Sequence, residues 1–216
     1  TADIPGQGKS LTLMQRNDEF SIKIAGIGGE LMNSRLHGSE DALATLPCEL
    51  LSGCTSPRVL VGGLGMGFTL AAALAALGPD AEVTVAELIP EVVDWNRGPL
   101  GAAAGYPLHD PRTRVHVGDV VALIQQSLGA FDAILLDVDN GPEGLTRKEN
   151  NALYNNTGLL AAQAALKPDG VLAFWSAGQD HAFTERLRRI GFTVEAITVR
   201  AIRPGKGARH VIWIAR

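Results

Sequence analysis

From Ser56 onward, short apolar runs alternate with longer runs in which alanine and leucine mix with charged residues. The short runs have the length and the apolar content of buried strands, and they lie at 58–63, 81–88, 113–118, 131–139 and 170–178. The longer runs predict helices near 68–77, 90–100, 119–128, 151–166 and 180–190. Strands that alternate with helices in this way indicate a parallel sheet with helices on both faces.

Both ends of the chain depart from this alternation. Two strand-like runs near the C-terminus follow each other with only a short loop between them, at 192–201 and 209–216. They predict an antiparallel hairpin at the edge of the sheet. The first part of the chain has short strand-like runs and then a helical connection, at 11–16, 20–26, 29–35 and 39–51. We therefore expect a small β-meander with its helical connection in residues 1–55 and an α/β domain in residues 56–216.

A glycine-rich turn separates the first strand of the α/β domain from its first helix. Gly63, Gly65 and Gly67 form a G-x-G-x-G pattern within "VLVGGLGMGFTLAAAL". A phosphate-binding P-loop would need a lysine here, and "GQGKS" near the N-terminus has Asp3 where that motif needs its first glycine. The third glycine also comes one position too early for the G-x-G-x-x-G pattern of a dinucleotide site. The variant is typical of the fold that binds S-adenosylmethionine (SAM), in which the turn faces the methionine part of the ligand.

Other residues suited to a nucleoside site follow at the carboxyl ends of the next strands, where open α/β sheets bind their ligands. Glu87 ends the second strand, about twenty residues after the turn, where a carboxylate can accept hydrogen bonds from a ribose diol. Asp119 and Val120 follow the third strand and offer a polar contact and an apolar slot to an adenine. Glu87 and Asp119 can also serve as simple helix caps, and Asp119 can do both.

Candidate catalytic residues follow the fourth strand. Asp137 ends this strand and is our candidate proton acceptor or substrate positioner, with Asp139 and Asn140 as its helpers. The polar segment 140–154 is long enough to be a substrate gate, and Tyr154 and His37 are candidate pocket residues. The five histidines show no ligand spacing, so we expect no metal site.

The composition and charge of the chain limit the classes of partner that we expect. The 216 residues carry a net charge of -4, which gives no electrostatic reason to expect a nucleic acid. No signal peptide is evident and no apolar run approaches 18 residues, so we expect no membrane partner. Cys48 and Cys54 are too few for a disulfide framework, which favours the cytoplasm. The strand edges of the meander predict a homodimer to which residues 10–35 contribute.

Several motifs together give the chain a resemblance to a known family. The quoted glycine turn, "VTVAELIPEVVDWNR", "DPRTRVHVGDV", "FDAILLDVDNGP" and "LKPDGVL" resemble the spermidine synthase-like branch (polyamine aminopropyltransferases) of the class I SAM-dependent methyltransferase superfamily. The resemblance runs from about residue 31 to 192, and the family also carries a small N-terminal β-domain. It implies a Rossmann-like, seven-stranded sheet in the order 3-2-1-4-5-7-6.

The chain departs from the family where a polyamine substrate is recognised. Gly65 stands where the family's GGGDGG motif has the aspartate that holds the aminopropyl amine of decarboxylated SAM. Asp137 matches the usual proton acceptor, but Asn140 replaces the aspartate that binds the acceptor's amine. The family's YHE motif has no match in "SEDALATLPCELL".

These departures set our expectations of function. We expect a SAM-dependent transferase acting on a small-molecule acceptor, with methyl transfer favoured because Gly65 leaves room for the carboxylate of SAM. Aminopropyl transfer from decarboxylated SAM is one alternative. A catalytically degenerate binding or assembly subunit with the same fold is the other.

Overall fold

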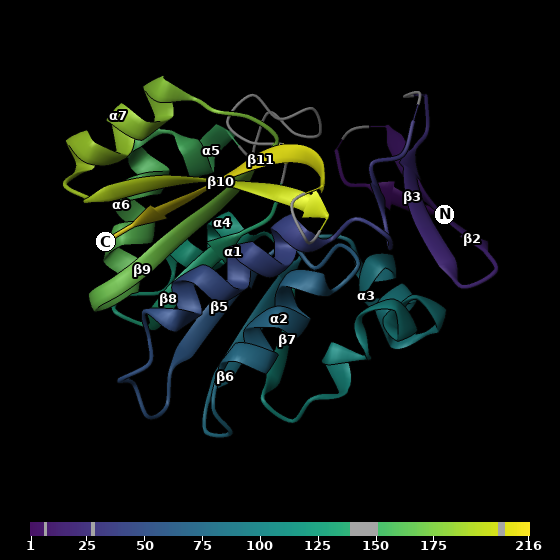
Figure 1. Cartoon of the computed structure of the whole chain (residues 1–216), viewed down its shortest axis with the longest axis horizontal. Helices are drawn as coiled ribbons and strands as arrows, with labels where there is room; N and C mark the ends of the chain where they lie inside the picture. The colour runs from purple at the N-terminus through teal and green to yellow at the C-terminus, as the bar shows by residue number, and fades with distance from the viewer. Residues whose placement is uncertain (7, 27–28, 139–150, 203–205) are drawn as a thin grey trace.

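The computed structural model describes residues 1–6, 8–26, 29–138, 151–202 and 206–216. Two sheets organise this part of the chain (Figure 1). The smaller is antiparallel with strands in sequence order, namely β1 (Ala2–Ile4), β2 (Lys9–Arg16), β3 (Glu19–Ile24) and β4 (Met32–Asn33). It confirms the expected N-terminal β-extension, although the sequence reading missed β1, whose three residues are too short for a period-2 pattern.

The larger sheet has seven strands in the order β10-β11-β9-β8-β5-β6-β7. Its parallel strands are β5 (Arg58–Gly62), β6 (Glu82–Glu87), β7 (Thr113–Val117), β8 (Phe131–Leu136) and β9 (Leu166–Ser176). Antiparallel to β9 runs the C-terminal hairpin of β10 (Val194–Ile202) and β11 (Lys206–Ala215). The α/β Rossmann-like fold, the strand order and the hairpin at the sheet edge are all confirmed.

Helices cover both faces of this sheet. One face packs against α1 (Gly38–Glu49), α2 (Phe68–Ala76) and α3 (Pro90–Arg97), and the small sheet contributes to the same core. The other packs against α4 (Val120–Gln125), α5 (Asn151–Tyr154), α6 (Asn156–Ala165) and α7 (His181–Ile190). Two 3-10 turns, η1 (Pro99–Ala104) and η2 (Pro107–His109), lead from α3 toward β7.

The run expected as one helix at 151–166 is divided. Asn155 stands between α5 and α6 with an extended backbone, and its side chain accepts a hydrogen bond of 2.9 Å from the N–H of Gly158. The asparagine therefore starts a new helix instead of continuing the previous one, because its side chain satisfies an N–H that the helix leaves unpaired. None of the helices that the structure describes is long and apolar enough to cross a membrane.

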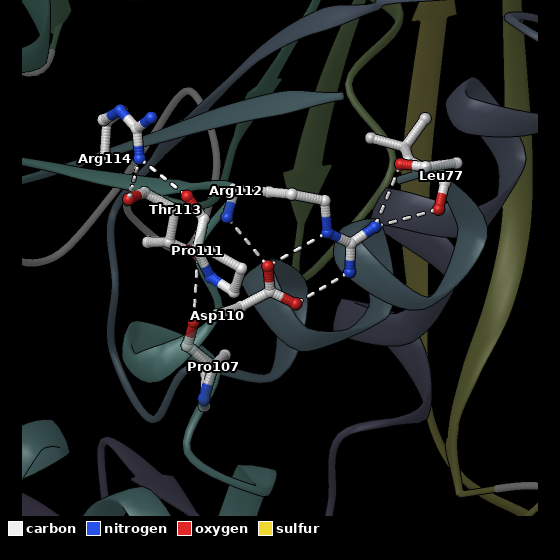
Figure 2. Close-up of polar contacts among 8 residues, drawn as sticks. Leu77, Pro107, Asp110, Pro111, Arg112, Thr113 and Arg114 are labelled. Carbon is white, nitrogen blue, oxygen red and sulfur yellow. Dashed lines mark hydrogen bonds and ion pairs between the residues drawn. The ribbon is translucent and has the colours of Figure 1, made fainter. Parts of the chain in front are cut away.

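A polar clamp holds β7 in place (Figure 2). Arg112 donates from Nε and Nη2 to the two carboxylate oxygens of Asp110 at 3.0 and 2.7 Å, and from Nη1 to the carbonyls of Leu77 and Gly78 at 3.0 and 3.1 Å. This forked geometry is one that guanidinium groups favour. The clamp connects the end of α2 to the start of β7. It thereby holds in place the strand that precedes Asp119.

Candidate functional site

A cavity opens at the carboxyl ends of the central parallel strands, between them and the small N-terminal sheet. Its lining includes the glycine turn after β5, the ends of β6 and β8, the residues after β7, and apolar side chains of the small sheet. From the large sheet come Gly63, Gly65, Glu87, Gly118, Asp119, Val120 and Asp137, and from the N-terminal segment come Ile4, Leu11, Ile22, Leu31 and Met32. The structure thus brings together most of the cofactor residues expected from the sequence. The apolar contribution of the first 32 residues was not expected.

The glycine turn has a backbone that other residues adopt rarely. Gly63, Gly65 and Gly67 all have positive φ angles, of 89°, 51° and 85°. A Cβ atom at Gly63 would lie 2.3 Å from the carbonyl oxygen of Asp137, a distance that no side chain tolerates. The glycine therefore allows the turn to run against the end of β8, which places the catalytic candidate beside the cofactor turn.

Gly65 faces the small sheet. A Cβ atom at this position would lie 3.3 Å from the sulfur of Met32. The Gly65 carbonyl accepts a hydrogen bond of 2.9 Å from Asn96 of α3, which fixes the turn from its other side. Sequence reasoning did not single out Asn96, because an asparagine within a helix has no local signature.

The side chain of Glu87 is hydrogen-bonded to the backbone of the glycine turn. Its carboxylate accepts hydrogen bonds from the N–H groups of Leu64 at 3.0 Å and Ile89 at 2.9 Å. Burial raises the pKa of Glu87, and these backbone donors act in the opposite direction. The carboxylate lines the cavity, and the backbone N–H groups of Gly65 and Leu88 also act to lower its pKa. The N–H of Leu64, within the glycine turn, is therefore bonded to Glu87.

Asp119 both caps a helix and lines the cavity. It is the N-cap of α4, where its Oδ1 accepts a hydrogen bond of 2.8 Å from the N–H of Val121. It also lines the cavity, together with the buried Val120. Its place in the cavity is compatible with the expected adenine contact.

Asp137 follows β8 and lines the same cavity. Its Oδ2 accepts a hydrogen bond of 2.8 Å from the hydroxyl of Thr69, in the first turn of α2. Burial, together with the neighbouring charge of Glu40, raises the pKa of Asp137 to about 7. A carboxyl group with this pKa exists in both protonation states near neutral pH, as a proton acceptor must.

Glu40 is the main residue that the sequence reading missed. It lies in the first turn of α1, and burial raises its pKa as well, with a smaller contribution from Asp41 and an opposing one from His37. The hydroxyl of Ser39 donates a hydrogen bond of 2.6 Å to Glu40 Oε2. Glu40 is not among the residues that line the cavity, but its charge acts on Asp137 from an element far away in the sequence.

The remaining candidates lie elsewhere or outside the described residues. His37 stacks on Phe68 at 4.3 Å between ring centroids, and its Nδ1 lies 3.0 Å from Asp41 Oδ2. Tyr154 is buried on the opposite face of the large sheet, against Phe174 and Phe183. Neither lines the cavity as far as its lining is described. Asp139, Asn140 and most of the expected gate at 140–154 lie outside the described residues.

Comparison with known proteins gives the site its context. The model of the spermine/spermidine synthase domain matches residues 50–187. A spermidine synthase in complex with the transition-state analogue AdoDATO shares the fold with a TM-score of 0.73 and 19% identity, over 97% of this chain and 69% of that one. Spermidine synthase from Thermotoga maritima gives a TM-score of 0.70 and 19% identity, over 94% and 71% of the two chains. A probable spermidine synthase from Corynebacterium glutamicum gives 0.66 and 16%, over 98% and 78%.

These comparisons correct the expected reaction. We favoured methyl transfer from SAM because Gly65 removes a carboxylate from the glycine turn. The family model that matches most of the chain is that of spermine and spermidine synthases, and the three solved structures named above, with TM-scores of 0.66 to 0.73, are two spermidine synthases and a probable one. The preference for a methyltransferase was therefore wrong. The departures from the family's polyamine-recognition motifs, at Gly65, at Asn140 and in the missing YHE motif, were given more weight than the remaining motifs, which agree with the family.

Proposed function

Since the chain belongs to the spermine/spermidine synthase domain family, we propose that it transfers an aminopropyl group from decarboxylated SAM to a small-molecule amine. The family membership supports a group-transferring enzyme. The acceptor class is inferred from the charges in the cavity.

The observation that carries the proposal is the pair of carboxyl groups formed by Glu40 and Asp137. Asp137 lines the partly apolar cavity, the like charge of Glu40 acts on it, and burial raises the pKa of both groups. A cationic ligand in the cavity offsets this repulsion, because a positive charge next to Asp137 stabilises its ionised form. Both reactants of aminopropyl transfer are cations, one a sulfonium and the other an ammonium. The electrostatics of the site therefore favour this pair of substrates.

The residues around the pair suit the reaction. The acceptor must lose a proton before its nitrogen can attack the carbon next to the sulfonium, and Asp137 can take that proton. The new C–N bond forms as the C–S bond breaks, and the electron pair of that bond stays on sulfur, which leaves a neutral thioether nucleoside. Thr69 fixes the side chain of Asp137, which lines the cavity, by its hydrogen bond. Glu87 and Asp119 line the same cavity and, in this proposal, hold the nucleoside in line with the amine.

The test is an assay for the thioether product. The protein is incubated with decarboxylated SAM and, one at a time, with diamines, longer polyamines and monoamines, and methylthioadenosine is followed by chromatography and mass spectrometry. We expect product with at least one amine, and a loss of about 100-fold or more with Asp137→Asn, the usual range for a positioned proton acceptor.

The controls separate this proposal from its alternatives. Replacement of decarboxylated SAM by SAM should give no S-adenosylhomocysteine above background. Asp94→Asn, which removes an exposed carboxylate of α3, should leave the rate unchanged. If the wild-type protein forms no methylthioadenosine with any amine, the proposed function is wrong.

A further inference from the structure

The two sheets contribute different chemistry to the cavity. The large sheet supplies the charged residues of the described lining, which are Glu87, Asp119 and Asp137. The N-terminal segment supplies five apolar side chains, which together form the apolar wall: Ile4, Leu11, Ile22, Leu31 and Met32. A ligand in this cavity therefore meets carboxylates on the side of the large sheet and aliphatic or thioether groups on the side of the small one.

The apolar wall follows from the alternation of residues in the small sheet. In β3 the side chains of Ile22 and Ile24 are buried, whereas Lys23 between them is partly exposed. Because successive side chains of a strand point to opposite faces, the face that meets the cavity is the apolar one. Ile22 lies opposite Met32 in the register of β3 and β4, and its carbonyl accepts a hydrogen bond of 2.8 Å from the N–H of Leu31. The backbone thus holds these side chains of the wall together.

The apolar wall begins close to the candidate proton acceptor. Met32 lies beside the glycine turn, since a Cβ atom at Gly65 would be 3.3 Å from its sulfur. In the same turn, Gly63 lies against the backbone of Asp137. An acceptor amine that gives its proton to Asp137 therefore has the apolar wall within reach of its carbon chain.

The carboxylates of the cavity already have roles in the proposed reaction. Glu87 accepts hydrogen bonds from two backbone N–H groups and is the expected ribose ligand, and Asp119 caps α4 beside the expected adenine. Asp137 takes the proton of the reacting amine. A second ammonium group on an acceptor that extends along the apolar wall would lie against aliphatic side chains, where an unpaired charge is costly. A hydrocarbon chain in the same place is stabilised by burial.

We propose that the acceptor is an apolar primary monoamine whose nitrogen lies at Asp137 and whose hydrocarbon tail packs against the apolar wall, an inference that rests on the proposed aminopropyl transfer. The ammonium group loses one proton to Asp137, its nitrogen bonds to the carbon next to the sulfonium, and the C–S bond breaks with its electron pair kept by sulfur. The products are a secondary ammonium ion and the neutral thioether nucleoside, and the proton on Asp137 returns to solvent when they leave. The apolar wall selects the acceptor and takes no part in these bond changes.

The test compares amines that differ only in a second amino group, at saturating decarboxylated SAM. The pairs are butylamine with 1,4-diaminobutane and hexylamine with 1,6-diaminohexane. We expect kcat/KM for hexylamine to exceed that for 1,6-diaminohexane by about tenfold or more, because the second ammonium loses its hydration at the apolar wall. The step from butylamine to hexylamine should raise kcat/KM by about tenfold, since each buried methylene contributes about three- to fourfold.

Two variants place an amide in the apolar wall with little change of side-chain size, Met32→Gln and Leu31→Asn. Each should lower the ratio of kcat/KM for hexylamine to that for 1,6-diaminohexane by about fivefold or more. A change in donor binding does not alter this ratio, because both amines react with the same bound donor. Met14→Gln is the matched control, since Met14 lies on β2 of the same sheet, is 47% exposed and is not among the lining residues. It should leave the ratio unchanged, and urea unfolding checks that each variant is folded.

The outcomes separate this inference from the proposed function. If the wild-type protein forms methylthioadenosine at least as efficiently with the diamines as with the monoamines of equal length, the apolar acceptor is wrong and aminopropyl transfer stands. If hexylamine is preferred but the folded wall variants keep the wild-type ratio, the apolar wall does not contact the acceptor and the inference is again wrong. If no amine gives methylthioadenosine, the proposed function fails and this inference falls with it.

Discussion

The raised pKa of Asp137 predicts a specific dependence of stability on pH. The perturbation that reveals it is Asp137→Asn, which preserves the shape of the side chain and can still accept the hydrogen bond from Thr69. In the unfolded chain the carboxyl group ionises near pH 3.8, whereas in the folded protein it does so at about pH 7. The folded state therefore binds more protons than the unfolded state between these values. Its stability falls as the pH rises through this window.

The magnitude follows from the two pKa values. Each pKa unit is worth about 1.4 kcal/mol, so the full cost of ionised Asp137 above pH 7 is about 4 kcal/mol. Between pH 5 and pH 8 the wild-type protein should lose about 2–3 kcal/mol relative to the variant. This is an upper estimate, because Asp137 keeps part of its surface open to the cavity. The asparagine variant should therefore gain in relative stability as the pH rises.

The assay is urea unfolding of both proteins at pH 5 and pH 8, with the free energy of unfolding extrapolated to water. Asp94→Asn controls for the loss of one negative charge from the surface. A difference between Asp137→Asn and the wild type that is equal at both pH values would refute the reasoning. It would mean that Asp137 is solvated like an ordinary surface carboxylate.

Three further predictions concern the cofactor site and the clamp. Glu87→Gln should weaken binding of methylthioadenosine by about 2 kcal/mol in calorimetry, because a charged acceptor for the ribose is lost; unchanged affinity would exclude Glu87 as the ribose ligand. Gly65→Asp should shift the preference between the donors toward decarboxylated SAM by up to about 3 kcal/mol, since a carboxylate about 5 Å away attracts the amine of decarboxylated SAM and repels the carboxylate of SAM. This substitution should be combined with Met32→Ala, because the Cβ atom of the new aspartate would lie 3.3 Å from the Met32 sulfur. Competition binding of both donors measures this shift, and an unchanged ratio would show that the transferred arm does not lie over the turn. Arg112→Lys should lower the free energy of unfolding by about 1 kcal/mol, because a lysine cannot reproduce the forked contact with Asp110; equal stability in urea would show that the clamp is dispensable.

Local patterns in the sequence were sufficient to predict the fold and most of the residues that the large sheet contributes to the cavity. The glycine turn, Glu87, Asp119 and Asp137 each follow a strand of a parallel sheet, and such strands bring their carboxyl ends to one edge. Their meeting is thus a consequence of the alternation of strands and helices. The spermidine synthase-like family could be recognised for the same reason, since its motifs lie at these strand ends.

The tertiary structure alone decided what surrounds Asp137. Glu40 and Ser39 stand in the first turn of α1, where an acidic residue and a serine are ordinary helix-start residues. The period of apolar residues tells which face of an element is buried, but it carries no information on which distant faces meet. For that reason the neighbouring Glu40 and the apolar cover from the small sheet became visible only when the elements were packed together.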